Sequence, residues 1–133
     1  MDILGFNFQT GKKQFEEDII KLETAIKDHK IVVTHTDNRP IVGHFASSKN
    51  LMLVEKEGCE NDYPIFNDQK VTDLVMKGGL LHIIGARDLS DKNLMILKLL
   101  FFHRDLSDTF RVILTTKEVE DVNKRLRTTW PEL

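Results

Sequence analysis

Hydrophobic residues between positions 11 and 28 recur with the period of a helix. Phe15, Ile19, Leu22 and Ile26 follow one another at spacings of four, three and four residues. This spacing places the four side chains on one helical face. Three consecutive carboxylates follow Phe15, and carboxylates are stabilising near the positive, N-terminal end of a helix. The pattern therefore predicts an amphipathic helix over residues 11–28.

From residue 30 onward the pattern changes to short apolar and β-branched runs. The two segments between the first three runs, 37–40 and 47–50, have typical turn composition, with Asp, Asn, Ser and Pro. The runs lie at residues 31–36, 41–46, 51–56, 80–84, 94–102 and 109–115. We expect the first three to form an antiparallel meander. The run at 94–102 suits a central strand, with a buried helix left open, and Val71–Met76 fits a strand or a helix.

The C-terminal part predicts a second, closing helix over residues 116–127. Thr115 and Glu118 have the spacing of a capping box, and Val119, Val122 and Leu126 form an apolar stripe. The expected order is one helix, about seven strands and one helix. Since strands and helices do not alternate in this prediction, a parallel doubly wound sheet is disfavoured. We predict an α+β fold, in which residues 30–115 form an antiparallel, strongly bent sheet or partly open β-barrel.

Length and composition are typical of one globular domain covering residues 1–133. Hydrophobic residues make up 41% of the chain and charged residues 30%, so global disorder is not expected. The net charge of −2 argues against avid, sequence-independent binding to nucleic acid. The single cysteine, Cys59, cannot form an intrachain disulfide. Without a basic, apolar leader at the N-terminus, an intracellular location, cytoplasmic or nuclear, is expected.

Several segments resemble a pleckstrin-homology or GRAM-type domain. Residues 43–53 are similar to the second and third strands of that family, 94–100 and 110–114 to its last two strands, and 117–130 to its closing helix. The resemblance implies a non-catalytic protein-interaction or scaffold module. Many members bind inositol phosphates through several cations, and the candidates here are Lys30, His35, Arg39 and Lys49. Because these cations are few, a protein partner is favoured over a membrane lipid.

Other segments resemble Sm-like proteins, which form RNA-binding rings. Residues 37–43 are similar to the Asp-Gly-Arg-x-x-x-Gly stretch of that family, 50–53 to its Asn-Leu-x-Leu, and 77–78 to its Arg-Gly pair. Asn38 replaces the turn glycine, and the expected aspartate is missing. The resemblance implies an RNA site made by His44, Asn50, Lys77 and Gly78, which gives the alternative function of an RNA-binding ring subunit.

No motif predicts an enzyme. The chain has no GxGxxG, Walker, GxSxG or HExxH motif, so no catalytic residue, metal site or cofactor is predicted. Large aromatic side chains near the ends of elements often anchor interfaces, and Phe101, Phe102 and Trp130 are the candidates. We therefore expect another protein as the partner, in an assembly or oligomer. RNA and a peripheral membrane lipid are the alternatives.

Overall fold

Strands and helices alternate along the chain in the computed structural model, which describes residues 3–5, 15–60 and 67–129. The strands are β1 (Ile3–Gly5), β2 (Ile31–His35), β3 (Leu53–Glu57), β4 (Gly79–Ile84) and β5 (Phe110–Thr116). The α-helices are α1 (Phe15–Asp28), α2 (Arg39–Ser48), α4 (Gln69–Lys77), α5 (Asp91–Leu100) and α6 (Val119–Thr128). Short 3₁₀ turns, Thr36–Asn38 and Ala86–Asp88, follow β2 and β4.

All strand pairs in the described sheet are parallel. The strand order is β1-β2-β5-β4-β3, with the three-residue β1 and the five-residue β3 at the two edges. Val33 pairs with Leu114, and Leu81 with Val112. The predicted antiparallel, seven-stranded barrel is therefore wrong. The pleckstrin-like and Sm-like expectations for the fold fall with it, because both families are built on antiparallel barrels.

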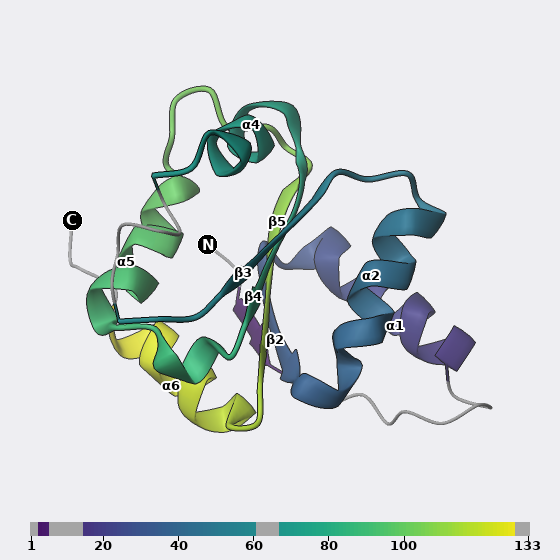
Figure 1. The fold of residues 1–133 in the computed structure, drawn as a ribbon, viewed down its shortest axis with the longest axis horizontal. Coiled ribbons are helices and arrows are strands. Elements are labelled where there is room, and N and C mark those ends of the chain that lie inside the picture. The colour runs from purple at the N-terminus through teal and green to yellow at the C-terminus, as the bar shows by residue number, and fades with distance from the viewer. Residues whose placement is uncertain (1–2, 6–14, 61–66, 130–133) are drawn as a thin grey trace.

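Helices cover both faces of the sheet, as Figure 1 shows with the sheet close to edge-on. Helices α1 and α2 lie on one face, and α4, α5 and α6 on the other. The chain leaves β2 through α2, reaches the far edge at β3, and returns through β4 to β5. Neighbouring strands β2 and β5 are thus followed by helices on opposite faces. This makes the molecule a doubly wound sheet whose topological switch point lies between β2 and β5.

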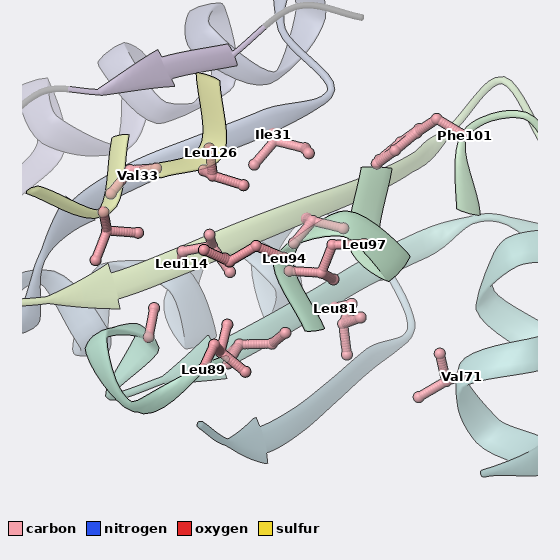
Figure 2. Close-up of a cluster of buried hydrophobic side chains, with 14 of the residues drawn as sticks. Ile31, Val33, Val71, Leu81, Leu89, Leu94, Leu97, Phe101, Leu114 and Leu126 are labelled. Atoms are coloured by element: carbon pink, nitrogen blue, oxygen red, sulfur yellow. The ribbon is translucent and has the colours of Figure 1, made fainter. Parts of the chain in front are cut away.

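Two apolar cores fill the layers on either side of the sheet. Under α4, α5 and α6, the larger core takes alternate strand residues such as Ile31, Val33 and Leu114. Figure 2 shows these side chains converging with those of α5 and α6, among them Leu94, Leu97 and Leu126. Val32 and Ile113 point to the other face, where they meet the apolar side chains of α1 and α2. Among the described residues no helix is both long and apolar enough to cross a membrane.

Two segments expected as strands are helices. In α2, Ile41, Val42, Phe45 and Ala46 are buried, and this i, i+1, i+4, i+5 spacing defines one helical face. Pro40 occupies the first turn of α2, where a missing N–H costs nothing. Helix α5 replaces the apolar run at 94–102, so of the two structures left open there the helix is the correct one.

Both α4 and α5 begin at side-chain caps that the apolar pattern did not reveal. The Asp68 carboxylate accepts a hydrogen bond from the Lys70 amide (2.8 Å), so the ambiguous segment at 71–76 is helical. At α5, the Ser90 hydroxyl accepts one from the Asn93 amide (3.1 Å). These caps satisfy amides that a helix start leaves unpaired. Once α2, α4 and α5 are helices, the order alternates as βαβ units, which require parallel strands.

Candidate functional site

The four cations proposed for phosphate binding do not come together. In a parallel sheet every strand begins at one end, here called the amino end, and finishes at the other, the carboxyl end. Lys30 precedes β2 and Lys49 follows α2, so both lie at the amino end. His35 closes β2 and Arg39 begins α2, at the carboxyl end. Because the length of the sheet separates the two pairs, the predicted inositol-phosphate cluster is not formed.

The residues proposed for RNA binding are also dispersed. His44 lies in the middle of α2, whereas Asn50, Lys77 and Gly78 lie at the amino end. Gly78 has a φ of 95° and follows the last residue of α4. Its conformation is thus explained by the turn between α4 and β4, a role suited to glycine.

Of the three aromatic candidates for an interface, one belongs to the core. The Phe101 ring is buried and its centroid lies 5.1 Å from that of Phe110. Phe102, in contrast, is 58% exposed, just beyond the end of α5. Trp130 lies outside the described residues. Phe102 is therefore the one of the three that the structure presents at the surface.

The switch point at the carboxyl end is where doubly wound folds commonly bind ligands. Here the protein's own groups occupy it. The Asn38 amide donates to the Thr34 hydroxyl (2.8 Å), and both residues are fully buried. Farther along the same end, after β3 and β4, Gly58 packs so closely on the neighbouring loop that an added Cβ would lie 2.3 Å from the Gly85 carbonyl oxygen. The connection from β2 to α2 contains no glycine to cradle a phosphate.

A chain of three polar side chains crosses the sheet beneath α2. Glu55 of β3 lies 2.8 Å from Nδ1 of His82 in β4, and the Nε2 atom of His82 lies 2.9 Å from the Thr115 hydroxyl in β5. Burial lowers the pKa of His82, although the hydrogen bond with Glu55 opposes this shift. The neutral imidazole then donates from Nδ1 to the carboxylate and accepts from Thr115 at Nε2.

This carboxylate–imidazole–hydroxyl order is that of a hydrolase triad, but no substrate can reach its hydroxyl. Both His82 and Thr115 have no exposed surface. A nucleophile must be accessible to the atom that it attacks, so the chain of bonds is a buried structural network. His82 is not among the candidate residues that the sequence singled out. The one available signal was a histidine inside the apolar run 80–84.

Exposed hydrophobic side chains gather at the amino end. Five large apolar residues in the described part of the chain are between 38 and 62% exposed. They are Ile20, Met52, Met76, Leu99 and Phe102. Met52 directly precedes β3, and Met76 lies in the last turn of α4. Leu99 lies in the last turn of α5, and Phe102 lies just beyond it. Because helices joining parallel strands run antiparallel to them, the last turns of α4 and α5 lie at the amino end together with the segment before β3, and these four residues share that end.

A cavity of about 400 Å³, the amino-end pocket, opens between the last turns of α1 and α2. Its apolar floor is formed by Ile26, Phe45, Leu51 and Leu80. Its charged and polar rim is formed by Glu23, Lys27, Lys49, Asp108, Thr109 and Arg111. An apolar floor with a few polar groups at its rim is typical of a binding pocket.

The rim of the amino-end pocket carries three cations and two carboxylates. Glu23 lies 3.8 Å from the Lys27 ammonium and 3.3 Å from that of Lys49, so one carboxylate serves two lysines. The Arg111 guanidinium donates to the carbonyl oxygens of Ile26, Asp108 and Phe110, and burial lowers its pKa. The rim therefore has a fixed arginine and an excess of positive charge.

Neither the protein-family models nor the curated proteins contain a match to this chain. Within the part of the chain that the structure describes, no three His, Cys, Asp or Glu side chains are grouped so that they could hold a metal ion.

Proposed function

We propose that this chain is a non-catalytic protein-interaction module whose partner docks at the amino end of the sheet. The observation that carries the proposal is the apolar-floored pocket at the amino end, where Met52, Met76, Leu99 and Phe102 are also exposed. Exposed apolar side chains grouped in this way mark interaction surfaces. At the carboxyl end, in contrast, the switch point between β2 and β5 is filled by the hydrogen bond between Asn38 and Thr34.

The charge at the pocket rim defines the partner segment. Three cations against two carboxylates favour an acidic ligand, and the floor accepts a large apolar side chain. We therefore propose that the occupant is a segment of a partner protein that presents a Leu, Ile or Phe next to an Asp or Glu. The apolar side chain enters the pocket, and the carboxylate meets Lys49 at the rim.

The burial of the carboxylate–imidazole–hydroxyl network supports a binding role over a catalytic one. His82 is hydrogen-bonded at both ring nitrogens, and neither it nor the Thr115 hydroxyl has any exposed surface. Catalysis requires a general base within hydrogen-bond reach of the substrate. The proposed interaction requires only the exposed surface and the amino-end pocket.

Selection from a phage-displayed random peptide library tests this proposal. We expect the enriched peptides to share a large apolar residue beside a carboxylate. On titration into the ¹⁵N-labelled protein, they should shift the amides of Lys49, Leu51 and Leu80. The substitution Lys49→Glu should weaken binding about five- to tenfold at low salt, because it reverses a rim charge. Lys117→Glu, the same change at another exposed lysine, at the carboxyl end, is the matched control.

Three outcomes would overturn the proposal. The first is a library that enriches no common pattern. The second is a set of peptides whose shifts map to the carboxyl end. The third is a chain that dimerises through this surface in solution, shown by a mass that doubles with concentration and returns to the monomer value in Lys49→Glu. In that case the occupant is a second copy of the chain.

A further inference from the structure

A second cavity lies on the other flank of α2, next to the edge strand β3. This α2–β3 pocket has a volume of about 510 Å³. Its lining residues are Thr36, Asp37, Arg39, Pro40, Gly43 and Glu55. It shares no lining residue with the amino-end pocket, and its lining is more polar. It exists because only two helices cover this face of the sheet, whereas three cover the opposite face.

The Glu55 carboxylate is held in a fixed direction at this pocket. One of its oxygens, Oε2, accepts the hydrogen bond from the buried Nδ1 of His82 (2.8 Å), which is itself fixed by Thr115 (2.9 Å). The Glu55 side chain is still 48% exposed. A buried group therefore orients an acceptor that remains accessible to a ligand, which is how preorganised polar sites are built.

Arg39 lines the same pocket, and neither carboxylate of the pocket forms an ion pair with its guanidinium. The ion pairs between described residues include no partner for Arg39, neither Glu55 nor Asp37. The Asp37 carboxylate instead lies 3.3 Å from Nδ1 of His35. Two opposite charges thus line one cavity without bonding each other.

Gly43 keeps the space above the helix open. It lies in the interior of α2, and a Cβ added there would meet no atom within 4 Å. A glycine in a helix interior costs about 0.5–1 kcal/mol relative to alanine. No packing within the described chain requires this glycine, and the room that it leaves is part of the pocket.

We propose that the α2–β3 pocket binds a small zwitterion, with its ammonium group on Glu55 and its carboxylate on Arg39. A simple cation would satisfy Glu55 but would be repelled by Arg39. A simple anion would satisfy Arg39 but would meet the carboxylates of Glu55 and Asp37. A ligand that carries both charges pairs with both sides through charge-assisted hydrogen bonds.

Calorimetric and NMR titrations with a series of amino acids test the assignment. The series is glycine, γ-aminobutyrate and ε-aminocaproate, whose charges are separated by increasing numbers of methylene groups. Butyrate and butylamine carry one charge each and serve as ligand controls. We expect one zwitterion to bind best and to shift the amides of Gly43 and Glu55. Both single-charge compounds should bind about tenfold or more weakly, since each loses a charged contact.

Three substitutions separate the parts of the site. Glu55→Gln keeps an acceptor for His82 but removes the charge, and Arg39→Gln removes the guanidinium. Both should reduce zwitterion affinity about tenfold or more. Gly43→Leu fills the open space without touching a charged group and should abolish binding. Ser47→Leu places the same side chain on an exposed position of α2 outside the pocket, and should bind as the wild type does.

Two results would overturn the proposal. One is the lack of any zwitterion-induced shift in a wild-type protein with an intact thermal unfolding transition. The other is binding that survives Gly43→Leu in a folded variant. Neither result bears on the amino-end pocket, which lies on the opposite flank of α2, so the two proposals fail separately.

Discussion

Acidification should destabilise this protein through one buried side chain, His82. Burial lowers the pKa of its imidazole below the ordinary value of 6.5, and this effect outweighs the opposing hydrogen bond and charge of Glu55. The folded protein therefore binds fewer protons at this site than the unfolded chain does. The stability contributed by the neutral imidazole is fully present above pH 6.5 and is lost as the pH falls through the folded-state pKa.

The magnitude follows from proton linkage. Where the unfolded chain is protonated at His82 and the folded protein is not, the free energy of unfolding falls by at most about 1.4 kcal/mol per pH unit. Urea denaturation at several values between about pH 8 and pH 5 measures this slope. The variant His82→Gln keeps one donor for Glu55 and one acceptor for Thr115 but does not titrate. Its curve should therefore be flatter than that of the wild type over this range.

Glu55→Gln provides an internal check on the sign. The Glu55 carboxylate raises the pKa of His82, so its removal should lower that pKa further. The stability loss should then continue to a more acidic pH than in the wild type. The reasoning is refuted if the wild type becomes more stable on acidification. It is equally refuted if His82→Gln shows the wild-type slope, because the pH dependence then arises elsewhere.

Three further substitutions test the packing. Gly43→Ala should stabilise the protein by about 0.5–1 kcal/mol, because its Cβ meets no atom and alanine is the better helix former; urea midpoints measure the gain, and a loss would place an undetected contact at this position. Leu97→Ala should cost about 2–5 kcal/mol in the same assay, because Leu97 is fully buried between α5 and the sheet. Gly58→Ala should destabilise by about 1–3 kcal/mol through its collision with the Gly85 carbonyl; an unchanged midpoint would contradict the close approach of these loops.

The sequence located most of the strands and both terminal helices. Strands β2, β3, β4 and β5 overlap the predicted runs, and buried apolar residues dominate β2, β4 and β5. Helix α1 lies within the predicted 11–28 segment, and α6 overlaps 116–127, because a 3.6-residue apolar stripe survives in both. Each of these two helices buries one face, and the apolar stripe in the sequence records that face.

Strand direction could not be predicted, because it depended on two ten-residue segments. Helix α2 buries Ile41, Val42, Phe45 and Ala46, and this β-branched and aromatic content resembles that of a strand. Helix α5 is apolar on several sides and shows little periodicity. Interpreting both as strands joined by turns makes an antiparallel sheet unavoidable. Interpreting them as crossover helices, together with the ambiguous segment at 71–76, makes every strand parallel, so the error in the fold follows from a few local assignments.

The candidate sites were beyond sequence reasoning for a different reason. His82 bonds to Glu55, 27 residues away, and to Thr115, 33 residues away. These three meet because parallel pairing places β3, β4 and β5 side by side. In an antiparallel arrangement the same residues would have other neighbours. The partners of a polar residue in a sheet are therefore known only once the strand order is known.

Helix α2 links the two proposals physically while allowing them to be tested apart. It crosses β5 and β4 on its way from β2 to the edge strand, with the amino-end pocket on one flank and the α2–β3 pocket on the other. Its inner face is fixed by four buried side chains, so a change on one outer flank has no simple way to reach the other. Gly43→Leu should therefore remove zwitterion binding and leave peptide binding at Lys49 intact. If it weakened both, α2 would have to move as a unit, and the two pockets would be coupled states of one site.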